Sequence, residues 1–394
     1  MGWAKERLIM EEERGYGSSD KVVCNNCVGN YYLKEYIHKN GNQNICDYCS
    51  SVAVSISMEK LMEPIMKGLW QEYENANDCM GYCGTEGGFI GADTYTAYDL
   101  IHEELWDEFD FQCAEMYDDV ANLISDAIVW CQRDPYGNLR CDEDFYTWEM
   151  YVDSLKKAGV DSKNNVCSDD ETTIYKSSDE ILTRITEGIK TLNLIEEIPL
   201  NTALWRARAH NKSDIVNSAA TLGVPKQQEA GCNRMNSTKI STFYGAFNKE
   251  TALFEIAERK EPMRTVGIFY NQLPLKIINF SKLRHSSVPS LFDIDNIEQR
   301  MLMIFLKMFN TEISKPIKGK KEYLPTQKFT EYLKDEITDV DGVRITGLLY
   351  NSAQCVNGVC CSLFIDCKQC SDDKDQVLWL DNTSIENLKK DVSK

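Results

Sequence analysis

The chain has 394 residues, of which 43% are hydrophobic and 27% are charged. This composition is that of a globular protein and excludes a disordered or fibrous chain, and the length suggests two or three domains. A formal charge of −19 argues against a general nucleic-acid binder and against a cationic membrane binder.

The charge is distributed unevenly along the chain. Residues 59–150 contain 4 Lys or Arg and 22 Asp or Glu, whereas residues 201–334 contain 21 Lys or Arg and 12 Asp or Glu. One segment is therefore strongly acidic and another is locally basic. This asymmetry indicates at least two units with different partners.

The start of the chain and its longest uncharged run lead us to expect a cytoplasmic protein that binds no membrane. Residues 1–14 are charged and lack the apolar core of a signal peptide, so free thiols or metal ligation are expected for the 16 cysteines. The longest run without a charged residue is 345–365, which contains several polar side chains that would be costly in lipid. We interpret it as two strands joined at the turn Asn357-Gly358.

Two CxxC pairs lie near the start of the chain. Cys24 and Cys27 form the first pair and Cys46 and Cys49 the second, with eighteen residues between them. This spacing is typical of a structural zinc site in which each short loop supplies two thiolates. The alternative is two reduced cysteine pairs without a metal. We expect a zinc ribbon over residues 1–50, which the ion stabilises directly because the segment is too small and polar for its own core.

We expect an acidic helical domain over residues 51–165, followed by a linker at 166–180. Apolar residues recur every three or four positions from Ile101 to Ala127, as on one face of a long amphipathic helix. The opposite face carries the carboxylates Glu103, Glu104, Asp107, Glu108, Asp110, Glu115, Asp118 and Asp119. A solvated face is the simpler interpretation, and a surface for a basic partner is the alternative.

Residues 181–394 alternate short β-like runs with helices, which predicts an α+β domain. Strands are expected at 204–208 and 241–247, and Asn248 is placed to cap the helix that follows. A further strand is expected over 342–352, leading into the hairpin. His210 and His285 are interpreted as surface residues.

Five motifs occur in order along this segment. They are Trp205-Arg206; Asn233-Arg234-Met235-Asn236, with Gly231 upstream; Phe243-Tyr244-Gly245; Glu250-Thr251-Ala252-Leu253-Phe254-Glu255; and a closing group of Asp341–Arg344, Tyr350-Asn351-Ser352 and Ser362-Leu363-Phe364. Together they resemble the RES domain, the toxin component of Xre–RES toxin–antitoxin pairs. The CxxC pairs and the helical segment resemble the HEPN/RES N-terminal domain, but the Arg-x4–6-His pair of HEPN ribonucleases is absent, so RNA cleavage is not inferred.

The resemblance implies cleavage of the nicotinamide–ribose bond of NAD, on a fold similar to that of ADP-ribosyltransferases. It assigns catalysis to Glu255, Arg206 and Tyr244, and NAD binding to Arg206, Arg234, Tyr244 and Ser352. Guanidinium groups bind a diphosphate through paired contacts, and a carboxylate stabilises an oxocarbenium-like state. Tyr244 can stack on nicotinamide or ribose, and Ser352 can hydrogen-bond to phosphate or ribose.

The residue pattern alone also allows each of these residues to have no role in catalysis or NAD binding. Arg208 lies two positions after Arg206 on the same strand face, so either side chain can be the ligand. Without the resemblance, Glu255 would be one of many surface carboxylates and Ser352 an ordinary strand serine.

The C-terminal cysteines suggest a second metal site. Cys367-x2-Cys370 forms one CxxC pair, but Cys360 and Cys361 are adjacent and would face opposite sides of a strand. The sequence offers no second clean pair for this site.

The expected function is that of an NAD-degrading toxin or defence effector, either a glycohydrolase or a phosphorylase. The alternatives are ADP-ribose transfer to a macromolecule and a non-catalytic zinc-ribbon interaction protein. We expect NAD, a controlling protein such as an antitoxin or trigger, and a second copy of the chain as partners, and no nucleic acid.

We hypothesise that the acidic segment 59–150 docks near the NAD entrance and gates access to it. The acidic segment and the basic segment 201–334 lie on one chain, so their effective mutual concentration is high. The alternative is that the acidic segment recruits a separate basic trigger.

Overall fold

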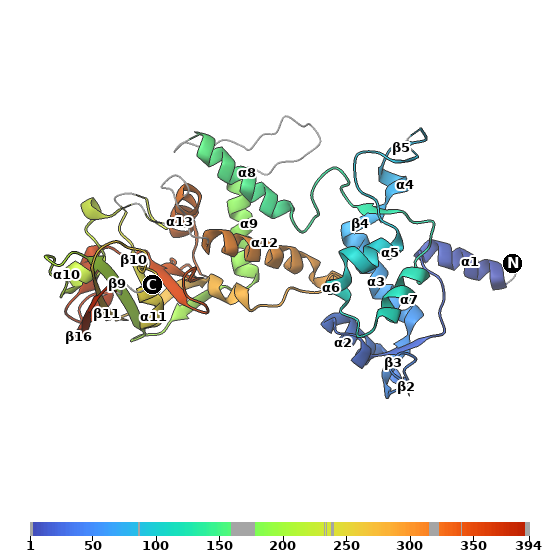
Figure 1. Ribbon diagram of the computed structural model, residues 1–394, viewed down its shortest axis with the longest axis horizontal. Coiled ribbons are helices and arrows are strands. Elements are labelled where there is room, and N and C mark those ends of the chain that lie inside the picture. Colours follow the sequence, from blue (N-terminus) through green and yellow to red (C-terminus); the bar gives the residue numbers. More distant parts are fainter. Residues whose placement is uncertain are drawn as a thin grey trace. The chain divides into compact units, whose positions relative to one another are not determined.

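The protein is described by a computed structural model covering residues 3–85, 87–158, 178–231, 233, 235–237, 240–314, 323–339 and 341–390. The chain divides into two compact units. Unit 1 comprises Met1–Tyr146 and Ser287–Ile304, and unit 2 comprises Thr147–Ser286 and Phe305–Lys394 (Figure 1). Most of the linker expected at 166–180 lies outside the described residues. In the described part of the chain, no helix combines the length and the apolar character that a membrane span requires.

Unit 1 combines short strands with helices. Its helices are α1 (Trp3–Arg14), α2 (Tyr31–Asn40), α3 (Met58–Glu72), α4 (Ala76–Cys79), α5 (Ala97–Asp99), α6 (Trp106–Phe109) and α7 (Ala114–Leu123), with the turns η1 (Asn25–Cys27), η2 (Leu100–Glu104) and η5 (Ile294–Asn296). Its strands are β1 (Val22–Cys24), β2 (Asn42–Ile45), β3 (Val52–Ser57), β4 (Tyr73–Asn75), β5 (Tyr82–Cys83), β6 (Gly88–Phe89) and β7 (Trp130–Gln132). The three strands around the CxxC pairs form an antiparallel sheet in the order β1-β3-β2.

One apolar core joins the CxxC segment to the helices of unit 1. Buried side chains of α2, α3 and α7 pack with Leu291 and Phe292 from the second stretch of the unit. The Phe109 and Phe292 rings lie 4.8 Å apart, and a Cβ at Gly68 of α3 would come within 2.7 Å of Phe292. The expected zinc ribbon and helical domain therefore share one core, which residues Ser287–Ile304 complete.

The long helix predicted from Ile101 to Ala127 is wrong. The structure has the π-helical turn η2 and the helices α6 and α7 in its place, interrupted at Asp110, which adopts a left-handed conformation with φ of 48°. The interrupted backbone pairs with the first CxxC loop: Gly29 N donates to Asp110 O at 2.7 Å and Gln112 N donates to Cys27 O at 3.0 Å. These tertiary hydrogen bonds replace the helical ones that the periodicity predicted.

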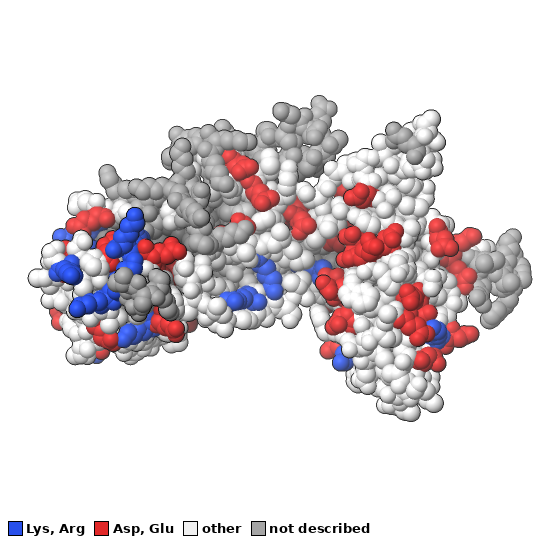
Figure 2. Space-filling model, viewed as in Figure 1, with Lys and Arg blue, Asp and Glu red and all other residues white. Residues whose placement is uncertain are grey.

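Half of the predicted acidic face has partners within unit 1. Its four paired carboxylates are Glu108 with Arg300, Glu115 and Asp119 with Lys21, and Asp118 with His102. On the face that Figure 2 shows, Asp and Glu still predominate over Lys and Arg in this unit. The surface available to a basic partner is thus smaller than the sequence pattern indicated.

Unit 2 is built on one nine-stranded sheet. Its order is β15-β16-β11-β9-β10-β14-β13-β12-β8, and the pairs are antiparallel except β12 with β13 and β15 with β16. The strands are β8 (Ile195–Ile198), β9 (Ala203–His210), β10 (Phe243–Ala246), β11 (Met263–Asn271), β12 (Leu275–Asn279), β13 (Gly347–Asn351), β14 (Val359–Leu363), β15 (Cys370–Ser371) and β16 (Leu378–Lys389). This sheet with its helices confirms the α+β prediction.

Unit 2 also contains helices, of which α10 (Ala219–Leu222) and α11 (Lys249–Phe254) pack against strands of the sheet. The others are α9 (Ser178–Thr191) and α13 (Leu324–Glu336), with α8 (Glu143–Ala158) and α12 (Ile297–Ser314) shared with unit 1, and the turns η3 (Gln227–Glu229), η4 (Phe280–Arg284) and η7 (Cys367–Gln369). Leu222 of α10 packs with Phe243 and Phe269 in one cluster. Aromatic contacts join Trp148 and Phe329 to Phe309, at 4.9 and 4.6 Å between ring centroids.

Local signals for the hairpin and for helix α11 are confirmed. β13 and β14 pair around Asn357, which has a φ of 61°, and the Asn248 side chain accepts a hydrogen bond from Thr251 N at 2.8 Å. His285 is exposed, as predicted, but the prediction for His210 is wrong. His210 is buried, with Nε2 2.8 Å from Thr265 Oγ1, because it ends β9 beside β11, which is an interior strand of the sheet.

Candidate functional site

The four cysteines of the CxxC pairs converge in unit 1. All four sulfur atoms lie within 4.8 Å of one another. Cys24 Sγ is 3.6 Å from both Cys27 Sγ and Cys49 Sγ, and Cys27 Sγ is 3.8 Å from Cys46 Sγ. A tetrahedral ion with metal–sulfur distances of about 2.3 Å has sulfur–sulfur edges of about 3.8 Å, so the geometry fits a metal centre with four thiolate ligands. No other group of three or more His, Cys, Asp or Glu side chains in the described part of the chain is arranged to hold a metal ion.

Local backbone structure positions these sulfur atoms. Cys24 ends β1 and Cys27 ends η1, while Cys46 N donates to Ser51 O at 3.0 Å and Ser50 N donates to Cys46 O at 2.9 Å. Burial raises the pKa of the Cys24 and Cys27 thiols. A bound cation must therefore displace protons from these thiols, and metal affinity should fall on acidification.

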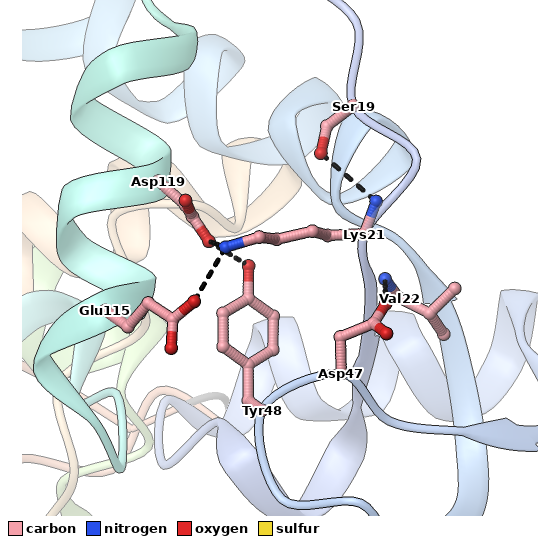
Figure 3. Close-up of polar contacts among 7 residues, drawn as sticks. All are labelled: Ser19, Lys21, Val22, Asp47, Tyr48, Glu115 and Asp119. Carbon is pink, nitrogen blue, oxygen red and sulfur yellow. Dashed lines mark hydrogen bonds and ion pairs between the residues drawn. The ribbon is translucent and has the colours of Figure 1, made fainter.

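Polar contacts tie the CxxC loops to helix α7 (Figure 3). Lys21 Nζ reaches Glu115 Oε1 at 2.7 Å and Asp119 Oδ2 at 2.6 Å, and Tyr48 donates its hydroxyl proton to the same Asp119 oxygen at 2.6 Å. Asp47 accepts from Val22 N at 2.6 Å. Lys21, before the first CxxC pair, and Tyr48, inside the second, thus share a partner on α7, which couples the four-cysteine cluster to the rest of unit 1.

Glu255 and Ser352 meet where two elements of unit 2 end. Glu255 follows α11 directly and is exposed, and Ser352 follows β13. Ser352 Oγ donates to Glu255 Oε1 at 2.6 Å and accepts from Gln354 N at 3.1 Å and Cys355 N at 2.9 Å. A hydroxyl has one proton and two lone pairs. Because two backbone N–H groups occupy the acceptor side, the hydroxyl proton is directed to Glu255.

A close approach between the hairpin and α11 sets this geometry. A Cβ at Gly358 would lie 2.7 Å from Thr251 Oγ1, and Thr251 is fully buried. Only glycine permits the hairpin to pack this tightly against the helix that ends at Glu255. The spacing between Glu255 and Ser352 therefore depends on Gly358, whose carbonyl oxygen also accepts a hydrogen bond from Ser352 N at 2.8 Å.

Cys360 is the member of this cluster that sequence reasoning missed. It is buried in β14 and pairs with Tyr350 of β13, two residues before Ser352. Burial, and then the Glu255 carboxylate, raise the pKa of its thiol, so a neutral thiol lies beside the carboxylate. The signal was available: the register of a hairpin closed at Asn357 places Cys360 next to the strand that leads to Ser352.

Tyr244 lies on the same sheet face as Cys360. The register of β10 with β14 pairs Tyr244 with Ser362 and Ala246 with Cys360, and side chains two residues apart share a face. The Tyr244 hydroxyl donates to Asn236 Oδ1 at 2.8 Å and accepts from Met235 N at 3.0 Å. The hydroxyl therefore positions Met235 and Asn236.

Arg206 lies on the opposite face. Trp205 pairs with Ala246, so Arg206 alternates to the side that Phe243 occupies, with its guanidinium carbon 5.2 Å from that ring centroid. Arg206 Nε donates to Leu222 O at 2.7 Å and Nη1 donates to Tyr244 O at 2.6 Å. Burial lowers its pKa to about 10. The structure thus brings Glu255 and Ser352 together. The Arg206 side chain instead connects α10 to β10 through its two hydrogen bonds to backbone carbonyls.

Arg234 lies outside the described residues, and two of its described neighbours, Asn233 and Asn236, are held by hydrogen bonds. Gln327 of α13 donates to Asn233 O at 2.7 Å and to Asn236 O at 2.9 Å. Asn236 is buried, and its side chain donates to Ile240 O at 2.8 Å.

We expect Arg206→Lys to lower the free energy of unfolding of unit 2 by about 1.5–3 kcal/mol, because one ammonium cannot bond both carbonyls as the guanidinium does. Arg208→Lys is the matched control. Arg208 is exposed on the same strand face and donates only to Thr221 O, so a change within about 0.5 kcal/mol is expected. Urea unfolding measures both variants. Unchanged stability together with a raised KM for NAD would instead make Arg206 a ligand of the substrate.

Two family models match the chain. The model for HEPN/RES N-terminal domain 1 matches residues 39–159, and the model for the RES domain matches residues 203–384. The chain is a RES-domain protein. Its RES domain contains all the motif residues from Arg206 to Ser352, and its HEPN/RES N-terminal domain begins between the two CxxC pairs. No curated protein and no solved structure matches this RES-domain protein.

The RES domain indicates the general class of function with which the site is consistent. A RES domain is consistent with an NAD-acting toxin or with an ADP-ribosyltransferase-like function. The Glu255–Ser352 pair lies inside this domain and its carboxylate is open to a ligand. It is therefore the candidate active site of the RES-domain protein.

Proposed function

We propose that this RES-domain protein cleaves the bond between nicotinamide and ribose in NAD at the Glu255–Ser352 site, and that it acts as a cytoplasmic toxin or defence effector by depleting NAD. The observation that carries the proposal is the 2.6 Å hydrogen bond from Ser352 Oγ to Glu255 Oε1, in which the serine proton is directed to the carboxylate. This bond fixes a negative charge at the end of α11, at an exposed position.

The chemistry needs a positioned negative charge. When the bond between ribose C1′ and the nicotinamide nitrogen breaks, its electron pair moves to the positively charged ring and leaves neutral nicotinamide. Positive charge then develops on the ribose as an oxocarbenium-like state, which the Glu255 carboxylate stabilises. The oxygen of water or of inorganic phosphate forms the new bond to C1′, and the attacking water loses a proton. The products are nicotinamide and either ADP-ribose or its 1″-phosphate.

The other motif residues take different roles in this proposal. The face of the Tyr244 ring stacks on nicotinamide or ribose, because its hydroxyl is occupied by Asn236 and Met235. Arg234 binds the diphosphate, as the family resemblance implies. Arg206 acts as a positioning residue that holds the Tyr244 carbonyl.

Incubation with NAD labelled in its adenine ring tests the function. The proposal expects loss of NAD and formation of free ADP-ribose, or of its phosphorylated form when phosphate is present. Label that remains on protein would instead support ADP-ribose transfer. No loss of NAD at any protein concentration would support a non-catalytic interaction protein.

Ser352→Ala is expected to lower kcat for NAD by about 10- to 100-fold with a small change in KM, because a hydrogen bond to a charged group is worth about 1.5–3 kcal/mol. Ser352→Thr keeps the hydroxyl and should restore most of the rate. A rise in KM with unchanged kcat would show that Ser352 binds the substrate instead of orienting Glu255.

We propose that the four-cysteine centre binds one structural zinc ion. The sulfur separations support this proposal, and four thiolates leave no open coordination position for a substrate. The ion would crosslink the two CxxC loops, and the contacts of Lys21 and Tyr48 would transmit that constraint to α7.

A further inference from the structure

We infer that a pocket beside helix α13 binds the adenosine half of NAD, so that the dinucleotide lies along one face of the sheet with its nicotinamide ribose at Glu255. This inference rests on the proposed function, because it assigns the remote part of the same substrate.

The pocket lies between α13 and the segment that precedes β10. Its volume is about 260 Å³, and its lining includes Met235, Asn236, Thr242 and Phe364. This volume is below the range of about 300–1,000 Å³ that is typical of a pocket for a whole ligand. The pocket is therefore suited to one part of a dinucleotide.

Tyr244 connects this pocket to the candidate active site. Asn236 lines the pocket, and its side-chain oxygen accepts the Tyr244 hydroxyl proton at 2.8 Å. Phe364 of the pocket follows the last residue of β14, and Cys360, which lies beside Glu255 on the face of Tyr244, is four residues before it in the chain. At about 3.3 Å per residue, they are separated by about 13 Å, which is comparable with the extended length of a ribose–diphosphate–ribose linker.

The side chains of the pocket match the chemistry of adenosine. Met235, Ile240 and Phe364 supply apolar and aromatic surface for the purine ring. Asp335 lies exposed at the rim, where a carboxylate can accept hydrogen bonds from the purine amino group or the ribose hydroxyls. Lys334 lies beside it and supplies a positive charge for phosphate oxygens.

The test uses AMP as the probe and Ile240→Trp as the variant that fills the pocket. Ile240 is only half-buried, so the larger ring can be accommodated without disrupting a core. Ile215→Trp is the matched control, because Ile215 is 75% exposed in the same unit and does not line the pocket. We expect Ile240→Trp to weaken AMP binding, measured by calorimetry on the full chain, by at least about tenfold, and the control to leave it unchanged.

Kinetics provide the second measurement. Ile240→Trp should raise KM for NAD by a similar factor with kcat unchanged, because the pocket contacts that it removes bind the ground state and the transition state equally. Cleavage of nicotinamide mononucleotide, which lacks the adenosine half, should be the same in the variant and the parent. If Ile240→Trp does not fold, Phe364→Ala replaces it and should weaken AMP binding by removing the ring contact.

The outcomes separate the pocket from the reaction. Three results would overturn the inference. The parent and the Ile240→Trp variant bind AMP equally, the parent does not bind AMP, or the variant loses activity equally on NAD and on nicotinamide mononucleotide. A parent protein that cleaves neither nucleotide would contradict the proposed function. Loss of AMP binding in the pocket variant would still support the adenosine pocket in that case.

Discussion

Replacing Glu255 with glutamine is expected to reduce the rate of NAD cleavage by at least about 100-fold and to leave the fold intact. Glutamine preserves the size of the side chain and an oxygen that can accept the Ser352 proton, but it removes the negative charge. The developing positive charge on ribose then loses its electrostatic partner. The measurement is kcat for NAD, with thermal unfolding to confirm that the variant is folded.

Glu250→Gln provides the matched control for this prediction. Glu250 is an exposed glutamate in the first turn of the same helix, α11, so the substitution makes the same chemical change about one and a half turns away. We expect a rate within about twofold of the parent, as for a surface substitution away from the site. Near-normal turnover by Glu255→Gln, or an equal loss in the control, would contradict the assignment of Glu255.

Substituting Cys24 with serine is expected to remove the metal ion and to unfold much of unit 1. A structural zinc ion contributes about 10–16 kcal/mol of apparent binding free energy in small zinc domains, which is comparable with the whole stability of a domain. Cys24 and Cys27 belong to the shared core of unit 1, so loss of the ion disturbs more than the two loops. Elemental analysis and thermal unfolding of the full chain measure both effects.

Cys367→Ser is the control for the metal prediction. Cys367 belongs to the C-terminal CxxC pair that the sequence suggested as a second metal site. We expect about one zinc ion per chain in this variant and no change in the unfolding of unit 1. Zinc retained after Cys24→Ser and lost after Cys367→Ser would move the metal centre to the C-terminal cysteines.

Features governed by neighbouring residues could be predicted from the sequence. The hairpin followed from the turn at Asn357-Gly358, and the start of α11 followed from Asn248, because both depend on backbone preferences within a few positions. The convergence of the CxxC pairs also followed from spacing alone. In each case the residues that predict the feature lie within or next to the segment that forms it.

Features governed by distant residues could not be predicted. The helix expected from Ile101 is interrupted because Asp110 and its neighbours bond to the first CxxC loop, and periodicity contains no information about that partner. The hairpin register alone places Cys360 beside the strand that leads to Ser352, but the position of Cys360 beside Glu255 depends on the packing of that hairpin on α11 at Gly358. Single-residue patterns do not encode such long-range contacts.

The placement of residues Ser287–Ile304 affects how control by the N-terminal half can be tested. Leu291, Phe292 and Met301 are buried in the core of unit 1. A chain shortened to begin after residue 165 would expose these side chains, so a change in its activity would not isolate gating. Substitutions of exposed carboxylates in the full-length chain are the better test of the gating hypothesis.

Release of nicotinamide is the measurement that tests the central claim most directly. The full-length protein is mixed with NAD at equal concentration, so that even a single turnover is detected, and nicotinamide and NAD are quantified over time by mass spectrometry. We expect one nicotinamide for each NAD lost, with release by Glu255→Gln slower by at least about 100-fold. No release of nicotinamide by the folded, metal-loaded parent protein, or loss of NAD without nicotinamide, would contradict cleavage of the nicotinamide–ribose bond at this site.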